Sequence, residues 1–438
     1  MRGKLKKINV ALLIVVGLHL VALANVSFTP WPELHLWPYL MNHGYKLYQD
    51  IAFEKPPLVP NLLFLWFKVF GNTLFSLKAL TWGIIISTDI LIFSTAQKIH
   101  RLGRPLSFLA LGIYAIINVG FSGNGFWFDL LLAPLYLSCY YLIESNRFMA
   151  AGVVLGLSLI TKQNAIFALI PILFSLYKHS KNRDIKLLVK GAGLIIATCI
   201  LAASLAGTFS SLFKWTINFA PTLASMSLKL PNFKESLVIC LFLLPILFVS
   251  LSDIHLFLWG IISVSLLFPR FELFHLQTLA VFTALSLAKN LKGNKKINNA
   301  VFSILPITLL FVISMKNTTR VWKKSDRFYE DSTLSMASWI KLHTRPGEKI
   351  LLLNTWDHLY KLSNTLPATT AWYPYLAWYL SDDKTQSNFI TTLSHNPPRI
   401  IVSEGLSESP RNLIEVFLRN NFRSAGVIDN RFTIWEPK

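Results

Sequence analysis

Long apolar runs recur through the first 315 residues and limit what this chain can fold into. Such runs match the roughly 17–25 residues that an α-helix needs to cross the hydrocarbon of a bilayer. Inside lipid the backbone has no water to bond with, so a crossing segment must satisfy its own N–H and C=O groups as a helix. We therefore predict an α-helical polytopic membrane protein with about eleven spans, at residues 8–26, 73–97, 105–120, 126–143, 148–160, 163–177, 186–207, 236–251, 254–268, 273–289 and 299–315.

The basic residues are distributed between the loops as in a multi-pass membrane protein. The chain has 438 residues, of which 53% are hydrophobic, and a net charge of +20. Lysines and arginines gather in alternate loops, for example at Lys98, Arg101 and Arg104, which is the bias that keeps loops in the cytoplasm. We expect a multi-pass protein of the cytoplasmic membrane, in contact with the lipid bilayer and not with nucleic acid. Its N-terminus is then cytoplasmic and, with an odd number of spans, its C-terminus is extracytoplasmic.

The apolar runs stop near Lys316, which divides the chain into a membrane domain at 1–315 and an extracytoplasmic α/β domain at 316–438. The second domain contains no Gly-rich phosphate loop and no clear catalytic set, so we expect it to be an accessory domain. Its periodicity predicts a helix at Ser332 to Thr344, a strand at Ile350 to Leu353, a strand at Arg399 to Ser403, a helix at Pro410 to Asn420 and a strand at Arg431 to Trp435.

The first external loop, residues 27–72, is unusually polar for a connection between two spans. Its segment WPELHLWPYLMNHGYKLYQDIAFEKPP begins at residue 31 and contains Glu33, Asp50, Glu54 and Lys55. Charged groups beside a bilayer lose hydration unless something pairs with them, so these four need a partner or a function. A structural alternative is that Glu54 and Lys55 only pair with each other and that the prolines separate two helices.

Four more polar residues are expected at the outer face. Asp129 opens the fourth span, Lys162 lies in the turn between the fifth and sixth, and Arg270 and His275 open the tenth. Acids within membrane depth are usually functional, although Asp129 would also complement a helix dipole. Lys162 would either contribute to a site or extend to the interface. Arg270 and His275 have the donors to bind an anionic headgroup.

The other long outward segment, residues 208–235, contains several aromatic residues and is too long for a tight turn. It is expected to form an interfacial helix over the external face. Two interpretations remain open for it, a lid over a substrate cavity and a membrane anchor.

The acids Glu33 and Asp129 and the bases Lys55, Arg270 and His275 are thus predicted to converge on one outer cavity. This combination suits a phosphate-activated lipid substrate. Transfer of a sugar from a polyprenyl phosphate needs cations at the departing phosphate and a carboxylate that takes the proton of the attacking hydroxyl. Because the phosphate leaves without protonation, one acid is sufficient.

Several motifs resemble a known family in their order along the chain. The external loop, with GYKLYQDI at residues 44–51, FEKPPL at 53–58 and Phe70-Gly71, is similar to that of bacterial GT-C-fold glycosyltransferases. These include protein O-mannosyltransferase-like and aminoarabinose transferase-like enzymes. Further similar segments lie at residues 159–164, 270–275, 360–363 and 398–402, so the resemblance covers nearly the whole chain.

The resemblance implies a glycosyltransferase that moves a sugar from a polyprenyl-phosphate carrier to a glycan, lipid or protein acceptor outside the cytoplasmic membrane. Glu33 would be the general base, Asp129 the second acid of the cavity and Lys55 a contact of the donor phosphate. Glu54 would coordinate a divalent metal ion, which some members of the family work without. The family's loop acid stands about fifteen residues before the glycine, whereas Glu33 is nearer to Gly44, so Asp50 remains an alternative base.

Two other classes of function fit a polytopic protein with buried charges. One is a transporter or lipid flippase, and the other is a noncatalytic scaffold in envelope polysaccharide assembly. Transporters often contain inverted repeats. No convincing internal repeat is present in this chain, which favours the enzyme.

Overall fold

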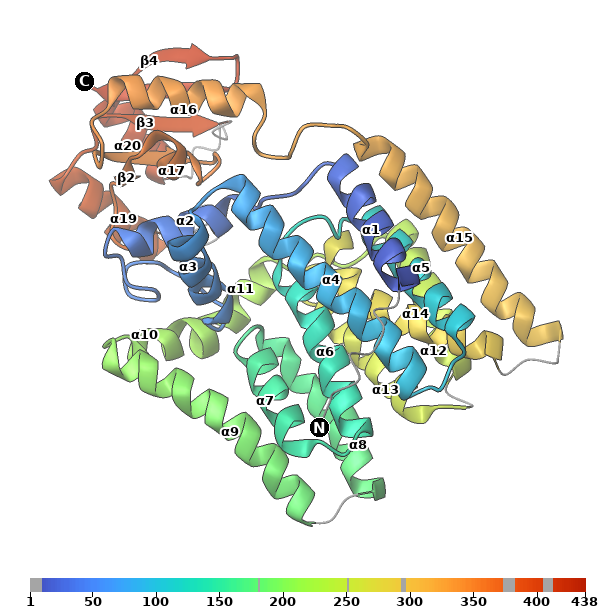
Figure 1. Ribbon diagram of the computed structural model, residues 1–438. Coiled ribbons are helices and arrows are strands. Elements are labelled where there is room, and N and C mark those ends of the chain that lie inside the picture. The colour runs from blue at the N-terminus through green and yellow to red at the C-terminus, as the bar shows by residue number, and fades with distance from the viewer. Residues whose placement is uncertain (1–9, 180–181, 250–251, 293–296, 373–382, 405–412) are drawn as a thin grey trace. The chain divides into compact units, whose positions relative to one another are not determined.

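The computed structural model describes residues 10–179, 182–249, 252–292, 297–372, 383–404 and 413–438 (Figure 1). The basic residues at 1–7 and the first residues of the helix predicted at 410–420 therefore lie outside the described residues. The chain forms two compact units, and each gathers three separate stretches of sequence. Unit 1 contains Met1–Thr29, Leu77–Cys199 and Lys229–Lys324, and unit 2 contains Pro30–Ser76, Ile200–Leu228 and Ser325–Lys438.

Unit 1 is helical. Each of the eleven runs predicted as spans falls on a helix or on two consecutive helical segments. These are α1 (Val10–Asn25), α4 (Leu74–Lys98), α5 (Arg104–Gly120), α6 (Phe128–Glu144), α7 (Phe148–Leu159), η1 (Gln163–Ala168), α8 (Leu169–His179), α9 (Asn182–Leu205), α12 (Phe233–Val249), α13 (Ile254–Ile262), η3 (Ser263–Leu267), η4 (Leu273–Leu276), α14 (Gln277–Lys292) and α15 (Ile297–Val321). The first residues of α4 and the last of α9 belong to unit 2.

Three helices of the described chain are both long and apolar enough to cross a membrane, namely Leu74–Lys98, Asn182–Leu205 and Ile304–Val321. Six shorter apolar helices of 10–17 residues accompany them, including Val10–Asn25 and Arg104–Gly120. Helix α14 differs from these because every residue from Gln277 to Ala288 is buried. A helix that is apolar and buried all round occupies the interior of a bundle.

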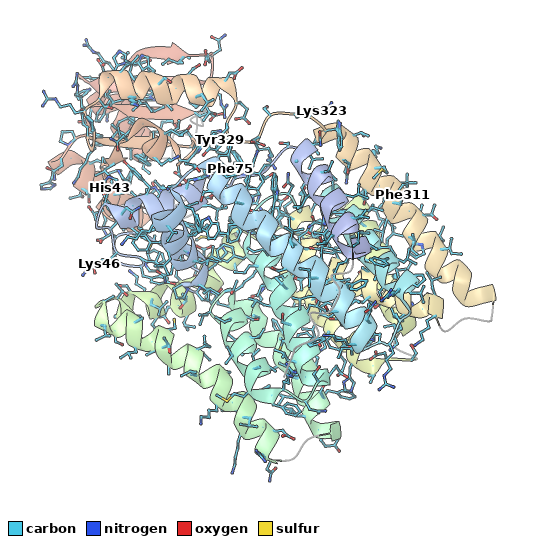
Figure 2. The ribbon with its side chains drawn as sticks, in the orientation of Figure 1. His43, Lys46, Phe75, Phe311, Lys323 and Tyr329 are labelled. Carbon is cyan, nitrogen blue, oxygen red and sulfur yellow. The ribbon has the colours of Figure 1, made fainter. Side chains whose placement is uncertain are left out.

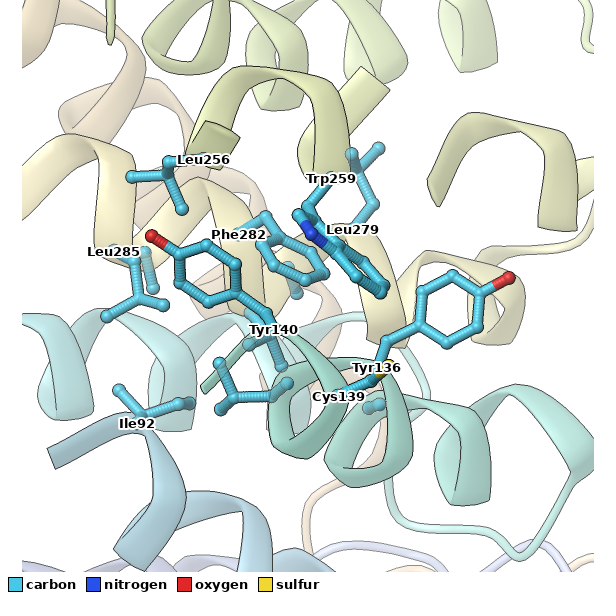
Figure 3. Packing of buried hydrophobic residues seen from close by; sticks show 14 of the residues in the cluster. Ile92, Tyr136, Cys139, Tyr140, Leu256, Trp259, Leu279, Phe282 and Leu285 are labelled. Carbon is cyan, nitrogen blue, oxygen red and sulfur yellow. The ribbon is translucent and has the colours of Figure 1, made fainter. Parts of the chain in front are cut away.

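Large aromatic side chains form the centre of unit 1 (Figure 3). Trp259 of α13 meets Tyr136 of α6 edge to face, with ring centroids 5.6 Å apart. On another side Trp259 stacks on Phe282 of α14 at 6.1 Å, and Phe282 lies edge to face with Tyr140 at 6.2 Å. Aromatic pairs at these distances add to the free energy gained by burial, so they fix α6, α13 and α14 together.

Glycines bring α7 and α9 into backbone contact. A Cβ atom on Gly152 of α7 would lie 2.1 Å from the carbonyl oxygen of Leu188, and one on Gly191 of α9 would lie 2.2 Å from that of Met149. No side chain fits at either position. Small residues permit this close approach, which is a common way for helices to associate in membranes.

Unit 2 contains a five-stranded sheet with the order β2-β1-β3-β5-β4. From residue 331 onwards the elements of unit 2 are α16 (Asp331–His343), β1 (Lys349–Leu353), α17 (Leu359–Ser363), β2 (Leu366–Pro367), α19 (Asp383–His395), β3 (Ile401–Glu404), α20 (Leu413–Asn421), β4 (Phe422–Ile428) and β5 (Phe432–Pro437). Strand β1 is parallel to β2 and β3, and β5 is antiparallel to β3 and β4. Helix α16 and strands β1, β3 and β5 lie where the sequence predicts them, whereas β2, β4, α17 and α19 were not predicted.

The external loop also belongs to unit 2, and it contains two helices that the sequence did not predict, α2 (Pro32–Asn42) and α3 (Leu58–Phe70). Pro32 opens α2 and Pro57 caps α3, which are positions where the missing N–H of proline costs nothing. Between the helices, the N–H of Ala52 donates to the carbonyl of Trp372 (2.9 Å), and the N–H of Trp372 donates to the carbonyl of Asp50 (2.8 Å). The loop and the C-terminal domain are therefore hydrogen-bonded to each other.

The segment at 208–235 is helical without a break from Phe209 to Met226, as α10 (Phe209–Phe213), the π-helical η2 (Lys214–Phe219) and α11 (Ala220–Met226). Its place at a membrane interface stays a prediction. The indole N–H of Trp215 donates to the carbonyl of Tyr48 (2.9 Å), so an aromatic residue of this segment is fixed to the external loop.

The glycine contact between α7 and α9 makes a sharp prediction. Gly191→Ala forces a methyl group against a backbone carbonyl, so the helices must separate, and overpacking of this kind costs about 1–3 kcal/mol. We expect a lower melting temperature in detergent. Gly193→Ala is the matched control, because a Cβ atom there has no neighbour within 4 Å. It should leave stability unchanged or raise it, since alanine favours helices by up to about 1 kcal/mol. Equal melting temperatures for the two variants would contradict the packing.

Candidate functional site

Asp129 is the centre of a buried charge cluster in unit 1. It lies in the first turn of α6 and is fully buried. The ammonium group of Lys162 lies 2.9 Å from its Oδ1 atom, and Nδ1 of His275 lies 2.5 Å from its Oδ2 atom. Thr278 donates its hydroxyl to the backbone carbonyl of Asp129 (3.1 Å). Both carboxylate oxygens therefore have partners, as a charge removed from water requires.

Each member of this cluster comes from a different part of the bundle. Lys162 follows α7 in the turn before η1, and its ammonium group also donates to the carbonyl of Leu266 at the end of η3 (2.8 Å). His275 lies in η4, immediately before the buried helix α14. The structure thus brings together Asp129, Lys162 and His275, three of the residues predicted for the site. Lys162 is buried, with 6% of its surface exposed.

Arg270 lies in a more open environment. Its side chain is 40% exposed, and its Nε–H donates to Glu272 (3.2 Å), which also accepts from Lys229 (3.0 Å). Ion pairs this exposed exchange readily with water or with a competing anion, because they contribute little free energy.

The predicted residues of the external loop lie in unit 2. Glu33 is in the first turn of α2 and only 2% exposed. Glu54 and Lys55 form an ion pair, and Lys55 keeps 23% of its side chain exposed. The carboxylate of Asp50 accepts the backbone N–H of Lys46 (2.8 Å), which closes the turn at residues 46–50.

The structure adds three residues that the sequence analysis did not select, Asp357, His358 and Lys361. They follow β1, beginning four residues after its last residue, Leu353. In parallel sheets the segments after the carboxyl ends of strands commonly carry binding residues, so the position of this segment after a predicted strand was the signal. The Nε2–H of His358 donates to the carbonyl of Phe328 (2.8 Å).

Burial controls the charge of these residues. It lowers the pKa of His358 to about 4 and that of His35, on α2, to about 3. Desolvation also lowers the pKa of Lys361. The pKa of Asp357 moves the other way, far above its usual range, because of desolvation and then because of the negative charge of Glu33. Both histidines are therefore neutral at pH 7.

A metal role for Glu54 has no support from its surroundings. Among the residues that the structure describes, no group of three or more histidine, cysteine, aspartate or glutamate side chains is placed to hold a metal ion. Hard divalent cations need several oxygen ligands. A metal ion at Glu54 therefore stays a prediction.

The residues that were predicted to converge on one cavity belong to two different units. Glu33, Glu54 and Lys55 belong to unit 2, whereas Asp129, Lys162, Arg270 and His275 belong to unit 1. Each set is defined within its own unit, so their meeting in one cavity stays a prediction.

No protein-family model and no curated protein matches the sequence, but solved structures resemble the fold. ArnT from Cupriavidus metallidurans in the apo state matches with a TM-score of 0.57 at 10% identity, over 97% of each chain. The same protein bound to undecaprenyl phosphate gives 0.54, with the same identity and coverage. The arabinofuranosyltransferase AftD from Mycobacteria gives 0.51 at 12% identity, over 98% of this chain and 40% of AftD.

These similarities establish the fold class. ArnT and AftD have the GT-C glycosyltransferase fold, and the likeness to ArnT extends over nearly the full length of both chains. The predicted fold, a helical GT-C-type membrane protein with a small C-terminal α/β part, is therefore confirmed.

Removal of one partner from the Asp129 cluster should destabilise unit 1. Lys162→Met and Asp129→Asn each leave buried polar groups uncompensated, which costs about 3–5 kcal/mol. The double variant should lose less than the sum of the single losses, because the two residues stabilise each other. Thermal unfolding in detergent measures the cycle. Lys229→Met, which breaks an exposed pair, should change stability by no more than about 1 kcal/mol. Additive losses would contradict the ion pair.

The lowered pKa values of the buried histidines predict that part of unit 2 loses stability in acid. A histidine whose pKa is lowered on folding binds fewer protons than in the unfolded chain, so its contribution is present above about pH 6.5 and is lost as the pH falls toward about 4. Hydrogen exchange, corrected for intrinsic rates, should show less protection of residues 354–360 at about pH 4.5 than at about pH 7. His358→Gln keeps a donor but cannot become charged, so it should reduce this loss. The same loss in both proteins would argue against His358.

Proposed function

We propose that this protein is an integral membrane glycosyltransferase. It transfers a sugar from a polyprenyl-phosphate carrier to an acceptor hydroxyl of a glycan, lipid or protein on the outer side of the cytoplasmic membrane. The observation that carries the proposal is the match to ArnT, whose structure holds undecaprenyl phosphate and whose fold corresponds to this chain over 97% of both lengths. The proposal includes a cytoplasmic N-terminus and an extracytoplasmic C-terminus.

The exposure of the cations suggests a division of their roles. Lys55 and Arg270 keep 23% and 40% of their side chains exposed, so a lipid phosphate has access to them. Lys162 and His275 are nearly buried against Asp129. We assign Lys55 and Arg270 to the donor phosphate, and Lys162 and His275 to fixing Asp129 at the start of α6. Cations at the phosphate stabilise the negative charge that develops as it leaves.

Glu33 is the preferred base. The acceptor oxygen attacks the anomeric carbon of the sugar, and the bond from that carbon to the phosphate oxygen breaks. The bonding electrons leave with the polyprenyl phosphate, and the acceptor proton passes to the carboxylate of Glu33. Asp50 is the weaker candidate, because its carboxylate already accepts the N–H of Lys46 within its own turn.

A transfer assay with a panel of radiolabelled polyprenyl-phosphate hexoses and pentoses tests the proposal. Glu33→Gln removes the base and should lower the rate by about 10²–10⁴-fold, the contribution of a general base. Lys55→Met should lower it by about 10²-fold or more, as for loss of one charge-stabilising donor. Asp50→Asn should stay within about threefold of wild type, since an amide oxygen also accepts the turn hydrogen bond.

Exposed residues provide the controls for this assay. Asp331→Asn and Lys341→Met change charge at the exposed ends of α16 and should transfer at the wild-type rate. Normal transfer by a folded Glu33→Gln protein would reject the base assignment. Movement of the labelled lipid across vesicles without transfer would favour a transporter or flippase, and a wild-type protein that does neither would favour a scaffold.

A further inference from the structure

The loop between α4 and α5 is fixed to the bundle of unit 1 by a buried histidine. The side chain of His100 is 1% exposed, and its Nδ1 atom lies 3.3 Å from a carboxylate oxygen of Asp253. Its Nε2 atom lies 3.3 Å from the hydroxyl of Tyr140. Tyr140 follows Asp129 by three turns of α6, about 16 Å along the helix axis. The loop is therefore well separated from the charge cluster of Asp129.

A lysine at the end of α14 fixes the same loop from another direction. The ammonium group of Lys292 donates to the carbonyls of Arg101 (2.9 Å) and His100 (3.4 Å). Arg101 has a φ of +51°, in the left-handed region that residues other than glycine rarely adopt. Such a conformation persists only where the surroundings hold it. The loop thus has a defined shape at the point where three helices end or begin.

Four exposed cations lie on this loop or contact it, and we call them the cationic patch. They are Lys98, the last residue of α4, Arg101, Arg104, the first residue of α5, and Lys292. The ammonium group of Lys98 lies over the ring of Tyr141, 5.8 Å from its centroid. Within the part of the chain that the structure describes, no member of the patch forms an ion pair with a carboxylate.

The acids on the neighbouring elements are already bound to other groups. Asp253 forms an ion pair with Lys289 and accepts the backbone N–H of Leu256 (3.0 Å), in addition to its contact with His100. Glu144, the last residue of α6, lies 2.7 Å from His255. The positive charges of the patch therefore have no counterion from these acids. Like charges repel one another, so an anion from outside the chain would stabilise the patch.

Exposed apolar side chains continue from the patch along the same helices. Ile90 of α4 is 46% exposed and Leu109 of α5 is 38% exposed. They lie about 12 Å from Lys98 and about 8 Å from Arg104, measured along the helix axes. A phospholipid has the same order of groups, with a phosphate at the surface and acyl chains beneath it. A free inorganic anion would match the cations but not the apolar side chains.

We propose that the cationic patch binds the phosphate of an anionic phospholipid of the bilayer. Lys98, Arg101 and Arg104 are also the residues whose bias predicts a cytoplasmic loop, so the lipid belongs to the cytoplasmic leaflet. That bias requires only positive charge in the loop. A fixed backbone and exposed cations without carboxylate partners are, in addition, what a binding site requires. The inference is independent of the proposed function, because it concerns a different part of unit 1.

Native mass spectrometry of the full chain in a neutral detergent measures the binding of single lipids. Phosphatidylglycerol should bind the wild-type protein more tightly than phosphatidylcholine, whose headgroup has no net charge. Each cation near a membrane surface contributes about 1 kcal/mol, or about fivefold in affinity. Arg101→Gln/Arg104→Gln should therefore weaken binding of phosphatidylglycerol by about 25-fold. Lys98→Gln should weaken it by about fivefold, so the test does not depend on folding of the double variant.

A matched control removes the same charge from another part of unit 1. Lys323 and Lys324 are exposed and follow α15, where Figure 2 labels Lys323. The N–H of Lys323 donates to the carbonyl of Asn25, the last residue of α1 (2.7 Å). Lys323→Gln/Lys324→Gln should leave the affinity for phosphatidylglycerol within about twofold of wild type. Equal weakening by the two double variants would show only a general attraction between opposite charges and would overturn the proposal. Equal affinity of the wild-type protein for the two lipids would also overturn it.

A thermal unfolding assay distinguishes the lipid from a free anion. The melting temperature of the wild-type protein in detergent should rise with phosphatidylglycerol and not with inorganic phosphate at the same concentration, since a ligand that binds the folded state stabilises it. Lys98→Gln should show a smaller rise, and Lys323→Gln/Lys324→Gln a rise equal to that of wild type. An equal rise with inorganic phosphate would assign the patch to a free anion and overturn the lipid site. Neither measurement uses sugar transfer.

Discussion

The cost of removing a carboxylate from water determines how both units are built. In unit 1 the fully buried Asp129 is tolerated because Lys162 and His275 bind both of its oxygens. These partners come from the turn after α7 and from η4, so one desolvated charge joins three parts of the bundle. The same requirement makes the cluster rigid, because movement of any member would leave a buried charge without compensation.

The carboxyl groups of Glu33 and Asp357 in unit 2 lie in a different environment. Burial and the negative charge of Glu33 raise the pKa of Asp357, while burial lowers the pKa of the neighbouring His358 to about 4. A carboxylate that is neutralised by two cations is a weak base. For this reason we propose an architectural role for Asp129 and keep Glu33 as the proposed base.

The helices of unit 1 were predictable because hydrophobic length is a local property. Each apolar run fell on a helix, and strands β1, β3 and β5 were visible as short apolar runs after turn residues. Helices α2 and α3 were missed because their polar and aromatic residues match a loop in composition, and they become helical by packing in unit 2. Asp129 and Lys162 could be selected individually, but their contact joins residues 33 positions apart and depends on the tertiary fold.

Asp357 follows the predicted strand β1, but its buried surroundings depend on the tertiary fold and could not be read from the sequence. The sequence suggested an accessory domain, since it contains no catalytic motif of its own. In the structure this domain and the external loop form a single compact unit, joined by backbone hydrogen bonds at Trp372 and by the rings of Phe328 and Tyr329. A domain that fixes the helix carrying the proposed base contributes to catalysis through geometry, because the orientation of a base affects its rate as much as its proton affinity does.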